Sequence, residues 1–133
     1  MLKQAKGTFE VKLNPQIETE TIDASLGRMT IDKQLHGDLE GTSKGQMLTA
    51  GTSTKNSGAY VAVEKVTGTL HGRSGSFVLQ HSATMTRGTP QLTIQVVPDS
   101  GTDQLIGLAG DFKITITEGK HYYEFDYSIS EGE

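Results

Sequence analysis

The sequence predicts an all-β protein, in which about eight antiparallel strands meander around a closed barrel within one domain over residues 1–133. The 133 residues include 16 glycines and only 3 prolines, a composition typical of short strands joined by tight turns. No segment shows the 3.6-residue apolar period of an amphipathic helix. A chain of this length buries a core of its own as a single domain.

Strands are predicted wherever β-branched, aromatic or alternating apolar residues lie between turn residues. In chain order they cover residues 7–13, 27–35, 39–49, 59–71, 76–86, 91–98, 105–117 and 120–129. Consecutive strands pair with one another, which makes a meander. Closing the meander removes the exposed strand edges that invite aggregation, so we expect a barrel rather than an open sandwich.

The register of each hairpin follows from keeping apolar side chains on one face, because a slip by one residue would reverse them. The predicted turns lie at Arg73 and Ser74, around "RGTP", at Glu118 and Gly119, and at residues 36–38. The resulting pairs are Leu70 with Phe77, Gly68 with Leu79, Val66 with His81, Glu64 with Ala83, Met85 with Leu92, Ala83 with Ile94, Leu35 with Leu39, Lys33 with Gly41, Ile114 with Tyr123 and Phe112 with Phe125.

Four polar side chains point into the predicted interior. His81 shares a face with Phe77 and Leu79, and Glu64 lies diagonally across from it, within side-chain reach. Lys33 follows the inward pattern of its strand, and Tyr60 shares the face of Glu64. Because isolated buried charges are costly, Glu64, Lys33 and His81 should contact one another or water.

These groups predict either a small-molecule site or an interior polar network that only holds the strands in register. The predicted ligand site comprises Lys33, Tyr60, Glu64, His81, Phe77, Leu79, Tyr123 and Phe125. A few converging polar groups in an apolar interior are typical of such sites. Glycines at 41, 45 and 68 favour a cavity by leaving space.

Three functions fit this interior. The first is a barrel that binds a small, largely apolar molecule, with the four polar groups orienting its polar end. The second is a cyclase, isomerase or lyase in which Glu64 and His81 are catalytic and transfer a proton or stabilise charge. The third is an oligomeric structural protein whose lumen is filled.

Several other classes are excluded by composition. The net charge of −4, without a basic run, excludes a nucleic-acid partner. No stretch is long and apolar enough to span a membrane, and the start "MLKQAKGTFEVKL" lacks the apolar core of a signal peptide, so a cytoplasmic location is expected. There is no cysteine, and the four histidines match no metal motif. We expect neither metal nor cofactor.

An apolar patch is predicted on the outer wall. Val61 and Val63 belong to the face opposite Tyr60 and Glu64, and Val78 lies beside them across the hairpin. A homo-oligomer interface, most simply that of a dimer, is a natural use for such a patch.

The sequence also resembles a known family over nearly its whole length. The runs "GRMTIDKQLHGDLEGTSKGQML", "GAYVAVEKVTGTLHGRSGSFVLQHSATMTRG", "VVPDSGTDQLIGLAG" and "GKHYYEFDY" are similar to an uncharacterised bacterial family of single-domain proteins with an allene oxide cyclase-like barrel. The segment "GTDQLIGLAGDFKITI" resembles the glycine-rich strand of allene oxide cyclases and dirigent proteins, which bind hydrophobic substrates in their barrels. The resemblance implies an eight-stranded barrel with a central cavity, frequent oligomerisation and no established activity.

Overall fold

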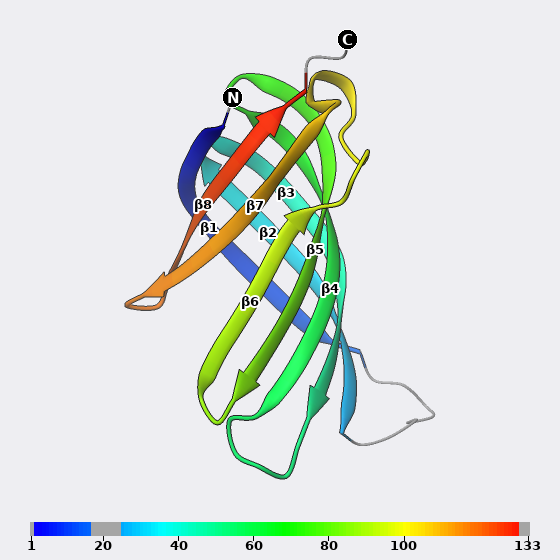
Figure 1. Cartoon of the computed structure of the whole chain (residues 1–133), viewed down its shortest axis with the longest axis vertical. Helices are drawn as coiled ribbons and strands as arrows, with labels where there is room; N and C mark the ends of the chain where they lie inside the picture. Colours follow the sequence, from blue (N-terminus) through cyan, green and yellow to red (C-terminus); the bar gives the residue numbers. More distant parts are fainter. Residues whose placement is uncertain (1, 17–24, 131–133) are drawn as a thin grey trace.

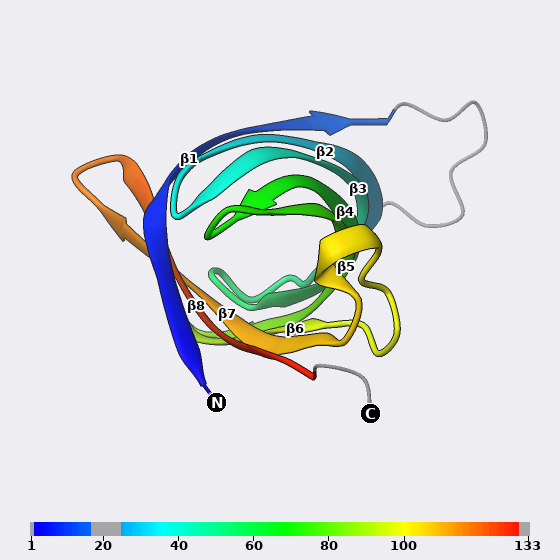
Figure 2. The same cartoon turned by 90° about the horizontal axis from the view of Figure 1, so that it is seen from above.

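Eight antiparallel strands follow one another around the barrel in chain order, and β8 returns to pair with β1 (Figures 1 and 2). The computed structural model describes residues 2–16 and 25–130. The strands are β1 (Lys3–Pro15), β2 (Leu26–Gly37), β3 (Leu39–Gly51), β4 (Gly58–Leu70), β5 (Arg73–Thr86), β6 (Thr89–Val96), β7 (Leu108–Thr117) and β8 (Lys120–Ile129). The predicted all-β, closed, single-domain barrel is confirmed.

The predicted strand over 105–117 begins too early. A 3₁₀ turn, η1 (Asp103–Leu105), precedes β7, which starts only at Leu108. Leu105 is fully buried, and Gly107 has a φ of +89° that turns the chain into β7. The segment before β7 therefore packs Leu105 into the hydrophobic core instead of extending the wall of the barrel.

Three predicted hairpin registers are wrong, those of β2–β3, β4–β5 and β5–β6, although every side chain keeps its predicted face. The β4–β5 turn lies at His71 and Gly72, so Leu70 pairs with Arg73 and not with Phe77. The β5–β6 turn lies at Arg87 and Gly88, so Met85 pairs with Pro90 and not with Leu92. In both turns the two residues have positive φ, as the favoured two-residue hairpin turns require. The predicted turn at Glu118 and Gly119 has the same form and is confirmed.

Because each register differs from prediction by an even number of residues, the inward and outward faces are unchanged. The observed pairs that replace the predicted ones are Val66 with Phe77, Gly68 with Gly75, Glu64 with Leu79, Ala62 with His81, Ala83 with Leu92, Leu35 with Gly41 and Lys33 with Ser43.

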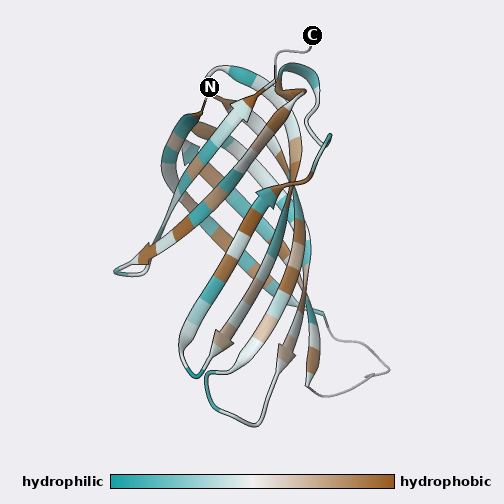
Figure 3. Cartoon of the chain, viewed as in Figure 1, coloured by the Kyte–Doolittle hydropathy of each residue, from teal (hydrophilic) through white to brown (hydrophobic). Residues whose placement is uncertain are grey.

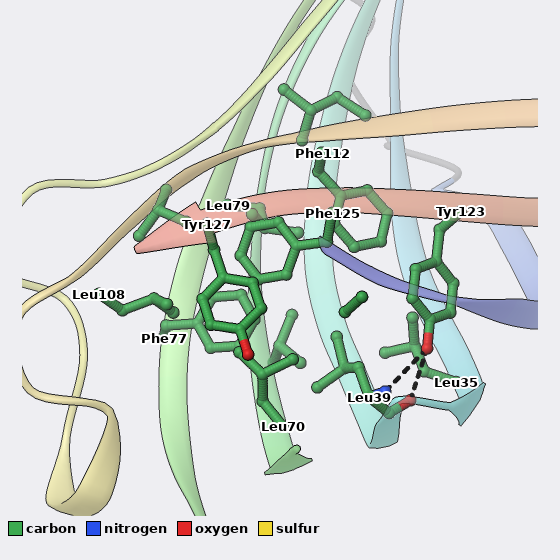
Figure 4. Close-up of a cluster of buried hydrophobic side chains, with 14 of the residues drawn as sticks. Leu35, Leu39, Leu70, Phe77, Leu79, Leu108, Phe112, Tyr123, Phe125 and Tyr127 are labelled. Atoms are coloured by element: carbon green, nitrogen blue, oxygen red, sulfur yellow. Dashed lines mark hydrogen bonds between the residues drawn. The ribbon is translucent and has the colours of Figure 1, made fainter. Parts of the chain in front are cut away.

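The β2–β3 register differs because a side chain from β8 enters this turn. The Tyr123 hydroxyl accepts a hydrogen bond from the Leu39 N–H at 2.9 Å, and it lies 3.0 Å and 3.1 Å from the carbonyl oxygens of His36 and Leu39 (Figure 4). The Asp38 N–H bonds to the Lys6 carbonyl oxygen. The predicted three-residue turn is thereby widened, and Leu35 pairs with Gly41.

Replacing Tyr123 by Phe should destabilise the protein by about 1–3 kcal/mol, because a buried N–H loses its partner. The ring can still stack on Phe112, at 5.3 Å between centroids. Tyr122→Phe is the matched control, since this neighbouring ring is 40% exposed on the outer wall. Urea unfolding of the two variants measures the difference, and equal stabilities would contradict the role given to the Tyr123 hydroxyl.

The hydrophobic core fills one half of the barrel, which we call the closed half. It lies where β1 pairs with β8, over Lys3–Phe9 and His121–Tyr127. Apolar and polar residues alternate along these strands, and the inward residues pack together (Figures 3 and 4). The core includes Phe9, Leu35, Leu39, Val66, Leu70, Phe77, Leu79, Phe112, Tyr123, Phe125 and Tyr127.

The wall is discontinuous in the other half of the barrel, which we call the open half. Within the described residues, β6 pairs with β7 only at Gln95 and Asp111, and residues 10–15 of β1 pair only with β2. The tip of the β7–β8 hairpin diverges from β6 on one side of the molecule (Figure 1). Strands β1 to β6 therefore form a curved sheet here, and its inner face is not fully covered.

The glycines at 41, 45 and 68 do not leave space, which corrects a prediction. A Cβ on Gly41 would lie 2.2 Å from the Thr67 carbonyl oxygen, and one on Gly68 would lie 2.1 Å from that of Glu40. A Cβ on Gly45 would lie 2.1 Å from the Val63 carbonyl oxygen. These glycines let the backbones of β3 and β4 approach closely instead of enlarging the lumen.

Candidate functional site

Glu64 on β4 is the centre of a buried polar cluster at the floor of the open half. Its side chain accepts a hydrogen bond from Lys33 Nζ at 2.8 Å on Oε2, and the same oxygen is bonded to His81 Nε2. The Ser43 hydroxyl donates to Oε1. Glu64, Lys33 and His81 are only 2%, 5% and 4% exposed. Both carboxylate oxygens are thus satisfied, as a buried charge requires.

The surroundings of Glu64 keep its carboxyl ionised. Burial by itself raises the pKa, but the hydrogen bond from His81 and the positive charge of Lys33 outweigh it and lower the pKa from 4.5 to about 2. Glu64 therefore carries its charge throughout the physiological range.

Tyr60 connects this buried cluster with the open half. Its hydroxyl lies 3.3 Å from His81 Nδ1, on the ring nitrogen opposite the one that binds Glu64. Because Nε2 faces a carboxylate, we assign it the hydrogen, which leaves Nδ1 able to accept from the phenol. Burial and the charge of Glu64 raise the pKa of Tyr60, so the phenol stays protonated. Phenol, imidazole and carboxylate form one hydrogen-bonded chain.

The strand order explains why these residues meet. Lys33 on β2 pairs with Ser43 on β3, both on the inner face. Glu64 pairs with Gly45 across β3 and β4, and a Cβ on this glycine would lie 2.7 Å from that of Glu64. The glycine therefore leaves a path by which the Glu64 side chain reaches Ser43 and Lys33. The predicted meeting of Lys33, Tyr60, Glu64 and His81 on one inner face is present.

The predicted apolar members of the ligand site belong to the hydrophobic core, although Leu79 pairs directly with Glu64. Phe77, Leu79, Tyr123 and Phe125 are each no more than 1% exposed in the core of the closed half (Figure 4). Phe77 stacks on Phe125, at 5.7 Å between ring centroids. Their role as ligand contacts stays a prediction, and the surface of the open half does not include them.

Two polar residues of the inner face were not predicted from the sequence. Ser43 would have followed from the correct partner of Lys33. His121 on β8 pairs with Phe9 and with Ile116, and its ring lies 5.0 Å from that of Phe9. The Lys33 ammonium also lies 5.0 Å from the Phe9 ring centroid. The predicted pairing of Ile114 with Tyr123 already implied that His121 faces inward.

The inner face of the open half carries partly exposed apolar side chains, which we call the inner apolar surface. Leu13, Met85 and Leu92 are 44%, 42% and 43% exposed, although the strand registers place them on the face of Glu64 and Tyr60. Its remaining members are half-buried: Val11, Met29, Met47 and Ala83. Solvent-exposed apolar side chains on a concave inner face favour a bound molecule.

A hollow of about 480 Å³ lies at the ends of the β3–β4 and β5–β6 hairpins and shares Met85 with this surface. None of Lys33, Tyr60, Glu64 or His81 lines it. Its lining residues are Ala50, Thr52, Thr54, Ser57, Gly58, Ala59, Thr84, Met85, Thr86 and Arg87. It therefore contributes nothing to the polar cluster.

The other two histidines lie on the outside or at the closed end. A hydrogen bond from His36 to Glu10, at 2.9 Å, raises the pKa of this exposed imidazole. His71, in the β4–β5 turn, contacts the Tyr127 hydroxyl and lies 3.5 Å from Asp38. Among the described residues, no group of three or more histidine or carboxylate side chains is placed to hold a metal ion.

A family described as "Protein of unknown function (DUF3224)" matches residues 5–127 of the chain. The chain belongs to this family. A crystal structure of a DUF3224 protein of unknown function from Shewanella oneidensis MR-1 is similar to it, with a TM-score of 0.93 and 45% identity, covering 99% of this chain and 100% of that chain. The search of curated proteins found no match. The predicted membership of an uncharacterised family is confirmed.

The outer wall of the DUF3224 barrel carries the predicted apolar patch. Val61 and Val63 are 51% and 52% exposed, and Leu48, which pairs with Val61, extends the patch onto β3. The homo-oligomer expected from it stays a prediction. Within the described part of the chain, no helix has the length and apolar character needed to cross a bilayer. The cytoplasmic location also stays a prediction.

Proposed function

We propose that this protein binds a small, largely apolar molecule against the inner apolar surface, with the polar end of the molecule at Tyr60. The observation that carries the proposal is the exposure of Leu13, Met85 and Leu92 on an inner face that also holds a buried ionic cluster. Burial of such side chains by a ligand is favourable at about 25 cal/mol per Å². The resemblance to barrels that bind hydrophobic substrates agrees with this ligand class.

The alternative of an oligomeric structural protein with a filled lumen fits only the closed half. There the inward residues are buried by one another, from Ala5 at 0% to Phe9 at 4% exposed. The open half differs because the wall is interrupted between β6 and β7. A ligand would complete the packing that the strands themselves leave unfinished.

An enzyme remains the second candidate, favoured by the hydrogen-bonded chain from Tyr60 through His81 to Glu64. Tyr60 Oη could take a proton from a ligand carbon while its own proton passes to His81 Nδ1, and Glu64 would stabilise the imidazolium. Return of the proton at another carbon would complete an isomerisation without any co-reactant. Incubating a co-purified compound with the protein in deuterated water tests this: exchange of carbon-bound hydrogen supports the enzyme, and no exchange leaves binding alone.

Binding itself can be tested with an uncharged fluorescent probe, N-phenyl-1-naphthylamine. The double variant Leu13→Gln/Leu92→Gln should weaken probe binding about tenfold or more, because it removes apolar contact area on the inner apolar surface. Val63→Gln is the control, since Val63 is similarly exposed on the outer wall. Fluorescence titration measures the affinities.

Native mass spectrometry of the protein purified from its own host complements this titration by detecting a co-purified compound. The binding proposal is wrong if the wild-type protein shows no saturable probe binding. It is also wrong if Val63→Gln weakens binding as much as the inner double variant does.

A further inference from the structure

The buried charges of the inner face neutralise one another. Lys33 and Glu64 form a direct ion pair at 2.8 Å, with side chains only 6% and 1% exposed. Both oxygens of Glu64 already accept hydrogen bonds, from Ser43 on one and from Lys33 and His81 on the other. In the described residues, no buried side-chain nitrogen or oxygen lacks a hydrogen-bond partner. The cluster therefore offers neither an unpaired cation to an anionic ligand nor an unpaired carboxylate to an amine.

Tyr60 is the member of the cluster that reaches the inner apolar surface. It is half-buried, and it pairs with Ala83 on β5, which in turn pairs with Leu92 on β6. Its hydroxyl lies 3.3 Å from His81 Nδ1, which is long for a hydrogen bond donated by a hydroxyl. A ligand oxygen at ordinary hydrogen-bond distance can therefore compete with His81 for the hydrogen of the Tyr60 hydroxyl.

The electrostatic surroundings of Tyr60 also select the charge of the ligand. The charge of Glu64 reaches the phenol, since it adds to burial in raising the pKa of Tyr60. An anionic group at this position would gain no unpaired cation, because Lys33 is already paired with Glu64. A cation would need to lose its water beside an apolar surface without gaining a free carboxylate, which is unfavourable.

Two further polar groups face the open half from other strands. His121 lies on β8 against Phe9, and Thr49 on β3 pairs with Tyr60. The hydroxyl of Thr49 is uncharged, and the imidazole of His121 packs against the Phe9 ring.

From these observations, and resting on the binding site proposed above, we infer that the polar end of the ligand is an uncharged hydrogen-bond acceptor, such as the carbonyl oxygen of a ketone, aldehyde or ester. The Tyr60 hydroxyl donates the hydrogen bond to it. His81 is a positioning residue that holds the phenol before the ligand binds, and Glu64, with Lys33 and Ser43, holds His81 in turn. None of these four residues contacts the ligand.

The experiment compares three molecules with the same carbon chain and different polar ends: 2-decanone, decanoate and decylamine. Each displaces N-phenyl-1-naphthylamine from the wild-type protein at about pH 8, where decanoate and decylamine are both charged. We expect the ketone to bind at least tenfold more tightly than either charged molecule. Equal or tighter binding of decanoate or decylamine overturns the inference, while leaving the binding site itself in place.

The role of Tyr60 is tested in the same assay by Tyr60→Phe, which keeps the ring. It should weaken 2-decanone about tenfold, the loss of one hydrogen bond, and weaken the probe, which has no carbonyl oxygen, by less. Tyr122→Phe, on the outer wall, is the control and should change neither. Unchanged 2-decanone affinity in Tyr60→Phe overturns the role of this hydroxyl. Absence of any probe binding by the wild-type protein overturns the proposed function itself, and the inference with it.

The comparison of polar ends uses only the wild-type protein, so it decides the inference even if Tyr60→Phe does not fold. Circular dichroism and the urea midpoint establish whether the variant is folded. A folded Tyr60→Phe protein that has lost more affinity for the ketone than for the probe supports the hydrogen bond, because a general loss of packing would weaken both alike.

Discussion

Lys33→Met should reduce the free energy of unfolding by about 3 to 5 kcal/mol, because it leaves the buried Glu64 charge without its cationic partner. Methionine has a similar length and keeps the apolar contact with Phe9, whose ring centroid lies 5.0 Å from the lysine nitrogen. The loss therefore reports on charge and not on packing volume. Urea unfolding of both proteins at neutral pH measures it.

A double variant separates the lost cation from other causes. Lys33→Met/Glu64→Gln removes both charges, while the amide can still bond to Ser43 and His81. It should be more stable than Lys33→Met alone, since replacing a whole buried ion pair by neutral groups is often close to neutral. A cost below about 1 kcal/mol for Lys33→Met would show that the pair does not hold the open half together.

Acidification should remove about 3 kcal/mol of stability through Glu64 alone. The pKa of this carboxyl is about 2 in the folded protein, against an ordinary value of 4.5. Its contribution is therefore complete above pH 4.5 and is lost as the pH falls toward 2. Unfolding free energies of wild type and Glu64→Gln, measured by urea across this range, should converge by this amount.

An exposed carboxyl provides the control for the unfolding measurements at low pH. Glu118, in the β7–β8 turn, is exposed, so Glu118→Gln should follow the wild type at every pH. A constant gap between wild type and Glu64→Gln down to the lowest pH would contradict the lowered pKa. The same result would remove the evidence that the cluster keeps a permanent charge.

The faces of the strands could be predicted from the sequence because side chains alternate with a period of two. Shifting the β4–β5 pairing from Phe77 to Arg73 opposite Leu70 left His81 and Glu64 on the inner face. Glu64 remains diagonal to His81, which now pairs with Ala62. The candidate cluster survived a wrong register for this reason.

The turn positions were harder, since several turn residues adjoin one another in "LHGRSGS". His71 adopts a φ of 46°, which is uncommon for a residue other than glycine, and alternation alone does not distinguish this turn from one at Arg73 and Ser74. The contacts of Tyr123 could be predicted even less from the sequence. Its hydroxyl bonds to backbone groups 84 and 87 residues away, and no local pattern encodes such a contact.

The amino-acid sequence by itself determined the all-β class, the meander and the inward face of Lys33, Tyr60, Glu64 and His81, because composition and alternation are local properties of a strand. The tertiary structure alone decided that Phe77, Leu79, Tyr123 and Phe125 fill one half of the barrel while Leu13, Met85 and Leu92 stay exposed in the other. That division depends on the register of each strand pair and on where β6 and β7 separate. The strand registers and the separation of β6 from β7 are set by packing among residues that are distant in sequence. The same packing brings the ionic cluster together at the floor of the open half.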